Sequence, residues 1–360
     1  MKNKKLLLGI AGCALVTIMS CPAYAEDIKV VDGDGMEYTF TEPIKSAVVY
    51  DRYNTELFRA VGATDLMVGV DQNAVDTYPQ YWDGVGKTLD IVGQNCTDFN
   101  VEKIVTLNPD AVFTSSLGEY ENMREQLADF DIPVLVVNAW IPSEYYDYIQ
   151  LVGDVTGNSE QAEEYIDFCK SAMETVTTGL ENIPEEERKT VYFENNGENK
   201  TCLPGSGWND MIVSAGGINI FGDIDYETAD QTKGNTSAYE IDPEAILDAN
   251  PDVIIDNIYS TKVHGELEAV VDLEEGELED ELASFVDRAG WDELTAVKDK
   301  QVYGFTSFVG NANSKLIAIN YIAKWLYPEK FEELDPDAFF SQWCEYMGFD
   351  QLEGYVAQLQ

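Results

Sequence analysis

The sequence predicts an α/β protein of two lobes joined by one long helix. Three observations support this prediction. Short apolar segments rich in β-branched residues alternate with helical segments, the alternation stops at a long amphipathic stretch, and it then resumes. Such alternation is typical of a parallel sheet with helices on both faces. A chain of 360 residues is long enough for two domains with full cores.

The first lobe is expected over residues 26–157. An Asp34-Gly35 turn between two alternating stretches predicts a hairpin over 28–42. Beyond it, buried strands are expected at 47–50, 66–70, 111–113 and 133–137, and helices at 54–61 and 123–130.

The linker is expected as one helix within residues 158–184. Apolar residues recur at helical spacing from Ala162 to Val176, and Asn158 or Ser159 can cap the start. About 25 helical residues span roughly 37 Å, which is long for a crossover inside a compact sheet. The second lobe then covers 185–360, with strands at 190–193, 253–256 and 301–304 and helices at 208–214, 290–297 and 316–326. The acidic run 274–281 is expected as a solvated helix face or loop.

Two stretches of the chain, 100–113 and 242–255, are nearly alike. Each carries a glutamate, Glu102 or Glu244, then Asn-Pro-Asp at a matched offset and an apolar run. The helix dipole favours an anion in the first turn, and proline bars continuation of the helix. The repeat suggests two similar lobes that each present one carboxylate. The alternative is coincidence between two ordinary helix–strand connections.

The N-terminus resembles a secretory signal. Lys2, Lys4 and Lys5 precede an apolar run over 6–19, and a small-x-small site ends at Ala25. Cleavage after residue 25 would leave an exported protein in the periplasm or at the cell surface. Cys21 lies in a loose lipoprotein-type sequence, so a lipid anchor at Cys21 stays open.

The composition is strongly acidic, with 67 Asp and Glu against 22 Lys and Arg and a formal charge of −45. A chain of this charge repels nucleic acid and anionic membranes. The cysteines beyond the signal show neither CxxC spacing nor a disulfide framework, and the sequence does not pair them. Each is expected as a small buried apolar side chain. These are Cys96, Cys169, Cys202 and Cys344.

Several segments, in order, resemble one family: the periplasmic binding proteins of ABC importers that carry iron complexes, haem and cobalamin. Besides the two repeats, they are Val92-Gly93, Ala215-Gly-Gly-Ile-Asn219, 291–303 and 321–331. The resemblance implies two Rossmann-like lobes on one helical backbone, a chelatase-like arrangement of class III that closes with little hinge motion. It also implies that Glu102 and Glu244 meet basic residues of an ABC permease, which works with a cytoplasmic ATPase. We expect a monomer that binds a small metal complex and no nucleic acid.

Ligands of open α/β sheets bind beyond the carboxyl ends of strands, so the loops there are candidates for the cleft. Arg52 is of most interest, because its planar fork of donors suits carboxylate or catecholate oxygens, although it could instead pair with a surface acid. Trp140, Trp208 and Tyr259 could stack on a flat ligand or pack in the rim or core. The full candidate set is Arg52, Tyr53, Asn95, Ser115, Trp140, Asn196, Trp208, Tyr259 and Phe308.

The chemistry expected is binding, not catalysis. The sequence holds one histidine, His264, which argues against a bare zinc site, and it has no GxSxG or HExxH motif. The tyrosines of 145–148 are expected to serve packing. No metal site and no cofactor are predicted. The expected ligand is an iron complex of siderophore or haem type. A corrinoid, an oxyanion and, less favoured, a chelatase-like enzyme remain the alternatives.

Overall fold

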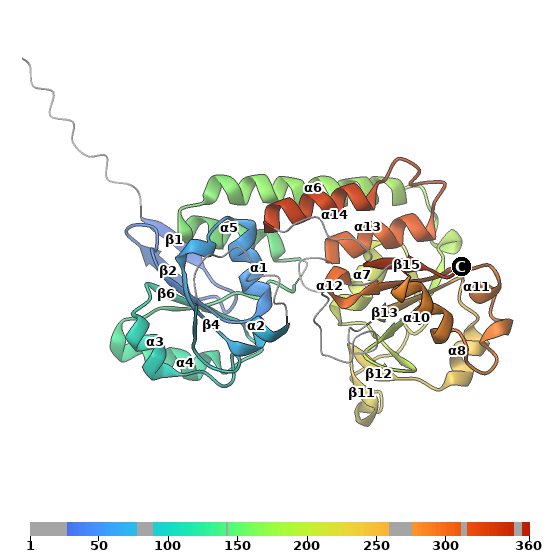
Figure 1. Cartoon of the computed structure of the whole chain (residues 1–360), viewed down its shortest axis with the longest axis horizontal. Helices are drawn as coiled ribbons and strands as arrows, with labels where there is room; N and C mark the ends of the chain where they lie inside the picture. Colours follow the sequence, from blue (N-terminus) through green and yellow to red (C-terminus); the bar gives the residue numbers. More distant parts are fainter. Residues whose placement is uncertain (1–26, 78–88, 142, 259–275, 311–314, 349–354) are drawn as a thin grey trace, which may run out of the picture.

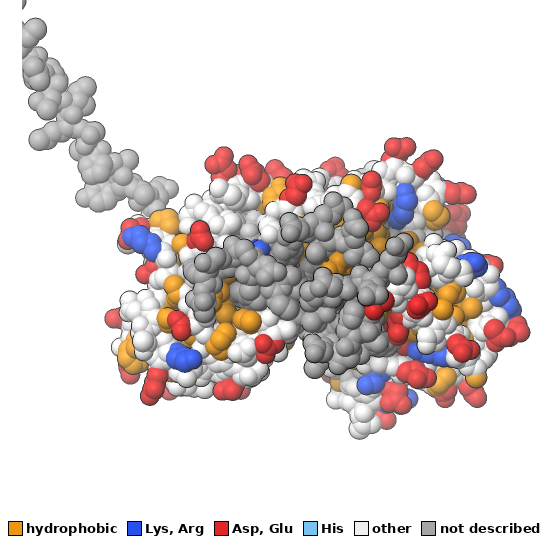
Figure 2. Space-filling view, in the orientation of Figure 1, with side chains coloured by type: hydrophobic (Ala, Val, Ile, Leu, Met, Phe, Trp, Pro, Cys, Tyr) orange, Lys and Arg blue, Asp and Glu red, His pale blue; other side chains and the backbone are white. Residues whose placement is uncertain are grey.

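The described residues form two large sheets, one in each lobe, and one long helix runs above both (Figure 1). The computed structural model describes residues 27–77, 89–141, 143–258, 276–310, 315–348 and 355–360. The two-lobed α/β fold expected from the sequence is confirmed. Acidic side chains are spread over the face of both lobes seen in Figure 2.

The N-terminal lobe is built on a five-stranded parallel sheet in the order β5-β4-β3-β6-β7. Its central strands are buried along their whole length, because helices cover both faces. The predicted hairpin is present as two paired strands ahead of this sheet. The strands are β1 (Ile28–Val31), β2 (Glu37–Phe40), β3 (Ala47–Val49), β4 (Met67–Val70), β5 (Asp90–Ile91), β6 (Ala111–Thr114) and β7 (Val134–Val136).

The helices of this lobe follow the strands, as the alternation predicts. Helix α5 was not assigned from the sequence, although Tyr145, Tyr148 and Ile149 are all buried at helical spacing. Tyr148 serves packing as expected, whereas Tyr145 and Tyr146 also line the cavity described below. The helices are α1 (Arg52–Ala60), α2 (Gln72–Thr77), α3 (Val101–Leu107), α4 (Tyr120–Leu127) and α5 (Tyr145–Thr156), with 3-10 turns η1 (Thr64–Leu66) and η3 (Ala128–Phe130).

Helix α6 (Ser159–Leu180) leads from one lobe to the other. Its 22 residues reach about 33 Å, enough to run along both lobes (Figure 1). One face is buried at helical spacing, including Ala162, Cys169 and Val176. Each lobe can therefore pack against a different part of the same rigid rod.

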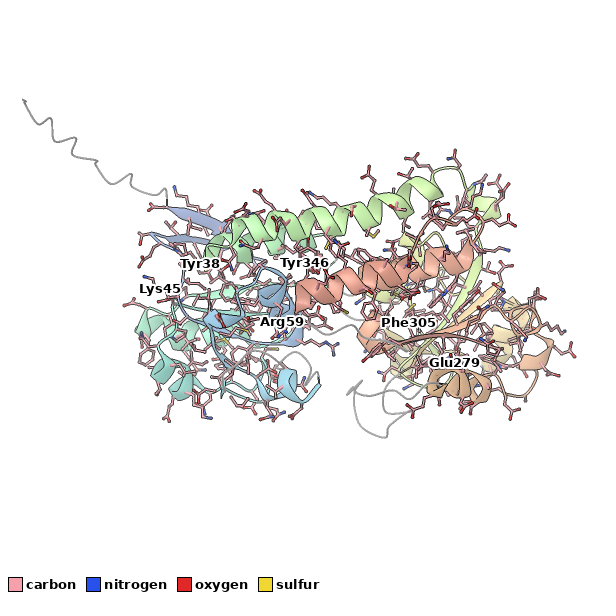
Figure 3. The ribbon with its side chains drawn as sticks, turned by 45° about the horizontal axis from the view of Figure 1, so that its top comes forward. Tyr38, Lys45, Arg59, Glu279, Phe305 and Tyr346 are labelled. Carbon is pink, nitrogen blue, oxygen red and sulfur yellow. The ribbon has the colours of Figure 1, made fainter. Side chains whose placement is uncertain are left out.

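A second helix, α14 (Pro336–Met347), lies alongside α6 in both Figure 1 and Figure 3. Phe339 stacks on Phe168 of α6 at 4.6 Å between ring centroids. At its C-terminal end, Met347 accepts a hydrogen bond of 2.5 Å from Arg59 Nε of α1. The sequence analysis expected α6 alone between the lobes. The C-terminal helix in fact reaches back from its own lobe to the N-terminal lobe and braces the linker.

The C-terminal lobe is built on a mixed sheet of eight strands. The order is β11-β12-β9-β8-β13-β14-β15, and β10 also pairs with β8. Strands β8, β13 and β14 run parallel at its centre, and β15 closes one edge antiparallel to β14. The strands are β8 (Thr190–Asn195), β9 (Lys200–Thr201), β10 (Ile218–Asn219), β11 (Gly234–Asn235), β12 (Ala238–Glu240), β13 (Val253–Ile258), β14 (Val302–Thr306) and β15 (Val356–Gln358).

One helix expected in this lobe differs in the structure. The expected helix over 290–297 is split into η6 (Trp291–Glu293) and α11 (Thr295–Lys298), because Leu294 between them is extended. Residues 277–281 of the acidic run form the start of helix α10, and Leu278 of this helix is buried. The others are α7 (Gly207–Ser214), α8 (Pro243–Ala249), α10 (Glu277–Phe285), α12 (Ser307–Gly310) and α13 (Lys315–Leu326), with turns η4 (Glu185–Glu187) and η5 (Gln231–Lys233).

The two sequence repeats fold alike, one in each lobe. Asn100 caps α3 and Asp242 caps α8 through side-chain oxygens. Both helices end in an asparagine in the left-handed conformation, Asn108 with φ 48° and Asn250 with φ 42°. The proline that follows each asparagine then directs the chain into a buried strand.

The aspartate of each Asn-Pro-Asp secures the first strand of its own sheet. Asp110 accepts hydrogen bonds from the backbone of Lys45 and Ser46, just before β3. Asp252 accepts from the backbone and hydroxyl of Thr190, at the start of β8. The two repeats therefore have the same structural role, one in each lobe.

The cysteines of the described part of the chain carry free thiols, with Cys96 half-buried and the other three buried. None of the helices in that part combines the length and apolarity needed to cross a bilayer.

Candidate ligand-binding cleft between the lobes

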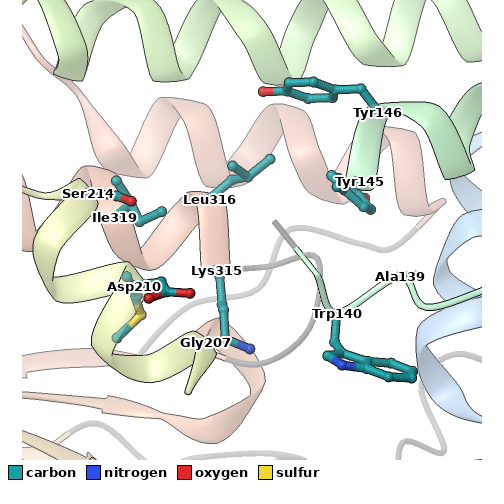
Figure 4. Close-up of a pocket in the computed structure, with 11 residues that line it drawn as sticks. Ala139, Trp140, Tyr145, Tyr146, Gly207, Asp210, Ser214, Lys315, Leu316 and Ile319 are labelled. Atoms are coloured by element: carbon teal, nitrogen blue, oxygen red, sulfur yellow. The ribbon is translucent and has the colours of Figure 1, made fainter. Parts of the chain in front are cut away.

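A cavity lies where the two lobes face each other beneath α6 (Figure 4). The N-terminal lobe contributes Ala139, Trp140, Tyr145 and Tyr146. The C-terminal lobe contributes Gly207, Asp210, Met211 and Ser214 of α7 and Lys315, Leu316 and Ile319 of α13. About 40 Å³ is open to water-sized spheres. Ligand pockets are typically about 300–1,000 Å³, so this cavity suits one end of a ligand.

Arg52 is held at the N-terminal lobe's edge of the cleft by an unusual turn. Asp51, which links β3 to α1, has φ 64° and ψ 157°, a region that non-glycine residues rarely adopt. Its N–H donates to Asp71 Oδ2 at 2.6 Å, and its own carboxylate accepts from the N–H of Asn54 to cap α1. Strained backbone of this kind clusters at functional sites.

Arg52 forms one group with two aromatic side chains. Its Nη2 donates to the hydroxyl of Tyr53 at 3.1 Å, and its guanidinium lies 4.8 Å from the centroid of that ring. The Tyr53 ring in turn lies 5.5 Å from Trp140. All three side chains are partly exposed. The group offers a cation and flat apolar surface side by side.

Two carboxyl groups lie close beneath this group. Burial raises the pKa of Asp51 to about 7, although the N–H of Asn54 opposes the shift. Burial also raises the pKa of Asp71. The hydroxyl of Ser115 lies close enough to lower the pKa of Asp51, yet Ser115 Oγ makes no sound hydrogen bond to any described residue.

The C-terminal lobe contributes a cation of its own. Lys315 begins α13 and is 8% exposed, and its Nζ lies 4.7 Å from the ring centroid of Trp208. A Cβ at Gly207 would lie 3.2 Å from Lys315 Cε, so glycine leaves this side chain its room. Burial and the charge of Arg52 lower the pKa of Lys315 to about 8, although Glu56 and Asp210 oppose the shift.

Buried polar atoms without a partner lie at the carboxyl ends of strands in both lobes. Among the described residues, none hydrogen-bonds Thr114 Oγ1 of β6, Asn257 Oδ1 of β13 or Thr306 Oγ1 of β14. An unmet buried polar atom costs about 1–3 kcal/mol, so these positions favour water or a polar ligand. In the same part of the chain, no three His, Cys, Asp or Glu side chains are arranged to hold a metal ion.

Comparison with known proteins decides the family. The sequence profile of the periplasmic binding proteins matches residues 48–307. The chain belongs to the periplasmic binding protein family. Like its relatives, it is a substrate-binding protein of an ABC transporter.

Two curated relatives and one solved structure illustrate this membership. YvrC of Bacillus subtilis strain 168, an uncharacterized ABC transporter substrate-binding lipoprotein, is 28% identical over 315 residues, covering 85% of this chain and 87% of YvrC. The molybdate-binding protein MolA of Haemophilus influenzae is 23% identical and covers 94% of both chains. The TroA-like periplasmic binding protein FepB of Veillonella parvula shares the fold, with a TM-score of 0.75 and 21% identity over 92% of this chain and 100% of FepB.

The structure of this periplasmic binding protein brings some candidate residues together and separates others. Asn95 uses its side-chain oxygen for Thr97 and Asp98 in its own turn, and Asn196 lies exposed after β8. Trp208 is 7% exposed and stacks on Phe193. The ammonium of Lys315, which lines the cavity, lies over the same ring, so Trp208 lies behind that lysine. Tyr259 and His264 lie outside the described residues. The backbone of Phe308 belongs to α12, but its side chain is not described. These ligand contacts stay predictions.

Of the residues that line the cavity, the candidate set from the sequence contained Trp140 alone, and it missed both charged residues, Asp210 and Lys315. Lys315 matters most here. A signal was available, because a lysine at the start of an apolar helix meets the positive end of the helix dipole. A cation placed there against the dipole suggests a function.

Glu102 and Glu244 are both exposed in the first turns of α3 and α8. Figure 1 shows these helices in different lobes, both on the side away from α6. Their contact with a permease stays a prediction.

Proposed function

We propose that this protein captures an anionic iron complex, of siderophore or haem type, outside the cytoplasm and delivers it to an ABC permease. The observation that carries this proposal is the group of Arg52, Tyr53 and Trp140 at the cleft. A guanidinium offers paired donors to negative oxygens, and neighbouring rings offer flat apolar contact to an aromatic or macrocyclic ligand.

The acidity of the chain does not preclude an anionic ligand. A net charge of −45 repels an approaching anion, but this repulsion is screened beyond about 8 Å at physiological salt. Hydrogen bonds to charged groups contribute roughly 1.5–3 kcal/mol each within the cleft. Local contacts with Arg52 therefore outweigh the long-range repulsion.

An oxyanion is the second candidate. It is favoured by the similarity to MolA along 94% of the chain and by the small size of the cavity. A corrinoid would need no role for Arg52. A chelatase-like enzyme is the remaining alternative, and the relatives named above, by their descriptions, bind substrates.

The first experiment is native mass spectrometry of freshly purified protein, with an absorbance spectrum to reveal a coloured ligand. Titration by tryptophan fluorescence then follows, with ferric siderophores, haemin, molybdate and cyanocobalamin. Arg52→Ala should weaken binding of the iron complex about tenfold or more. Lys298→Ala, at an exposed ion pair on α11, is the control for loss of a positive charge. Tight cobalamin binding that ignores Arg52→Ala would overturn the proposal.

The location and assembly state belong to the same proposal. We expect an exported monomer, cut after Ala25 or lipidated at Cys21, that docks on a permease with a cytoplasmic ATPase. The mass of the mature N-terminus distinguishes the two forms. A lipidated relative, YvrC, gives the anchored form some support.

A further inference from the structure

Lys315 is a buried lysine that forms no salt bridge with any of the acidic residues that the structure describes. Its side chain is 8% exposed, and its ammonium lies over the face of Trp208. A buried ammonium is strongly unfavourable unless it is paired or hydrogen-bonded. The start of α13 adds the positive end of a helix dipole, which disfavours the charge further.

A purely packing role does not account for this placement. A lysine that only packs its stem carries its ammonium to water, whereas Lys315 carries it toward the cavity between the lobes. Figure 4 shows the side chain reaching from α13 toward Gly207 and the part of the cavity where Trp140 lies. Gly207 has no side chain to fill that space, and a Cβ there would crowd Lys315 Cε at 3.2 Å.

The charges around Lys315 come from both lobes. Arg52 of α1 is close enough across the cleft to disfavour the lysine's charge, while Glu56 of α1 and Asp210 of α7 favour it. Lys315 lines the cavity, and Arg52 lies at its edge, because Arg52 contacts Tyr53 and Tyr53 contacts the lining residue Trp140. Two like charges therefore approach the cavity, one from each lobe. An anion between them would relieve both the repulsion and the desolvation of the lysine.

We propose that Lys315 contacts the ligand and sets the charge preference of the cleft, because an anionic group bound between the lobes bridges Lys315 of one lobe and Arg52 of the other. The inference rests on the proposed function, since it assumes an anionic ligand. Carboxylate, catecholate and oxyanion groups all have the required chemistry. The bound anion also holds the two lobes together, since one charged group contacts a cation of each lobe.

This arrangement couples binding to a proton. Without ligand, the pKa of Lys315 is about 8, so the amine is charged below that pH and increasingly neutral above it. A bound anion favours the charged form, and binding above pH 8 therefore takes up a proton. The dissociation constant should rise about tenfold per pH unit above pH 8, as linkage to one proton requires.

The test uses the full mature chain with three anionic probes: ferric 2,3-dihydroxybenzoate, haemin and molybdate. Cyanocobalamin is the uncharged comparison. Lys315→Met keeps an unbranched side chain of nearly the same length and should weaken binding of the anion about tenfold or more. Lys298→Met on α11 is the matched control and should leave binding within twofold.

The pH profile separates ligand contact from a structural role. Lys315→Arg keeps a charge that does not titrate in this range, so its dissociation constant should lack the extra tenfold rise per unit between pH 8 and 10. Asp51 and the probe still titrate in the Lys315→Arg variant. The difference between the pH profiles of the variant and the natural protein therefore reports the titration of Lys315 alone. Lys315→Met should melt at the same temperature or higher, because it removes a buried charge that none of the described acidic residues pairs in a salt bridge.

The outcomes distinguish the two proposals. Anion binding that is equal in Lys315→Met and in the natural protein, with parallel pH profiles, overturns the role of Lys315 and leaves the proposed function standing. Tight binding of cyanocobalamin with none of the three anions bound overturns the proposed function, and the role of Lys315 with it.

Discussion

The ion pair of Arg288 and Glu194 should be a strong determinant of the stability of the C-terminal lobe. Two parallel contacts of 2.8 Å join the guanidinium to the carboxylate. The side chains are only 17% and 1% exposed. The guanidinium also lies 4.4 Å from the ring centroid of Phe285 and 4.7 Å from that of Trp291.

Replacing Arg288 by Met would strand a buried carboxylate. Glu194 would keep its hydrogen bonds from the Tyr192 hydroxyl and the Asn199 N–H, but both of these donors are neutral. Breaking a buried pair by removing one partner costs about 3–5 kcal/mol, which sets the expected loss for Arg288→Met. Glu194→Gln in the same chain removes the stranded charge and should recover about half of that loss.

Urea unfolding followed by tryptophan fluorescence, to which Trp291 beside Arg288 contributes, measures these changes in the free energy of unfolding. Ligand affinity should stay within twofold, since the pair lies outside the residues that line the cavity. A loss below about 1 kcal/mol in Arg288→Met, or a double variant as unstable as the single one, would refute the reasoning.

Three further predictions concern docking, pH and the repeat. Replacing Glu102 and Glu244 together by Ala should abolish uptake in cells while the ligand's dissociation constant is unchanged; normal uptake would exclude the docking role. The pKa of Asp51, about 7 against an ordinary 3.8, means that its stabilising contribution is full below pH 4 and is lost as pH rises toward 7. Asp51→Asn keeps a helix cap but does not titrate. The free energy of unfolding of this variant in urea, minus that of the natural protein, should therefore be larger at pH 8 than at pH 5; equal differences at the two pH values would contradict this. Asp110→Ala and Asp252→Ala should each destabilise their own lobe by about 1 kcal/mol in calorimetry, because each removes two partly exposed hydrogen bonds; an effect in only one lobe would argue against equivalent roles.

The parts of the fold that were predictable depend on contacts near in sequence. Asn100 caps the N–H three residues on, and Asp242 caps the N–H two residues on. The Asn-Pro-Asp segments end their helices by local backbone geometry. Strand and helix periods likewise come from neighbouring residues, so the two lobes and α6 were predictable.

Helix α14 shows a signal that was present but not used. Phe339, Phe340, Trp343, Cys344 and Met347 follow helical spacing. That spacing predicts a helix, but it does not say what the helix packs against. Its place beside α6 depends on aromatic contacts between distant parts of the chain.

The cleft was the part that the sequence alone determined least. The sequence identified Arg52 by its chemistry and its place after a strand, and it also identified the family. Only the tertiary structure brought Lys315 to the wall of the cavity, where its ammonium lies over the ring of the buried Trp208. The physical reason is that the electrostatics of a cleft depend on which charges two separate lobes bring close together, and how much water they exclude. Neither quantity is encoded in the order of neighbouring residues.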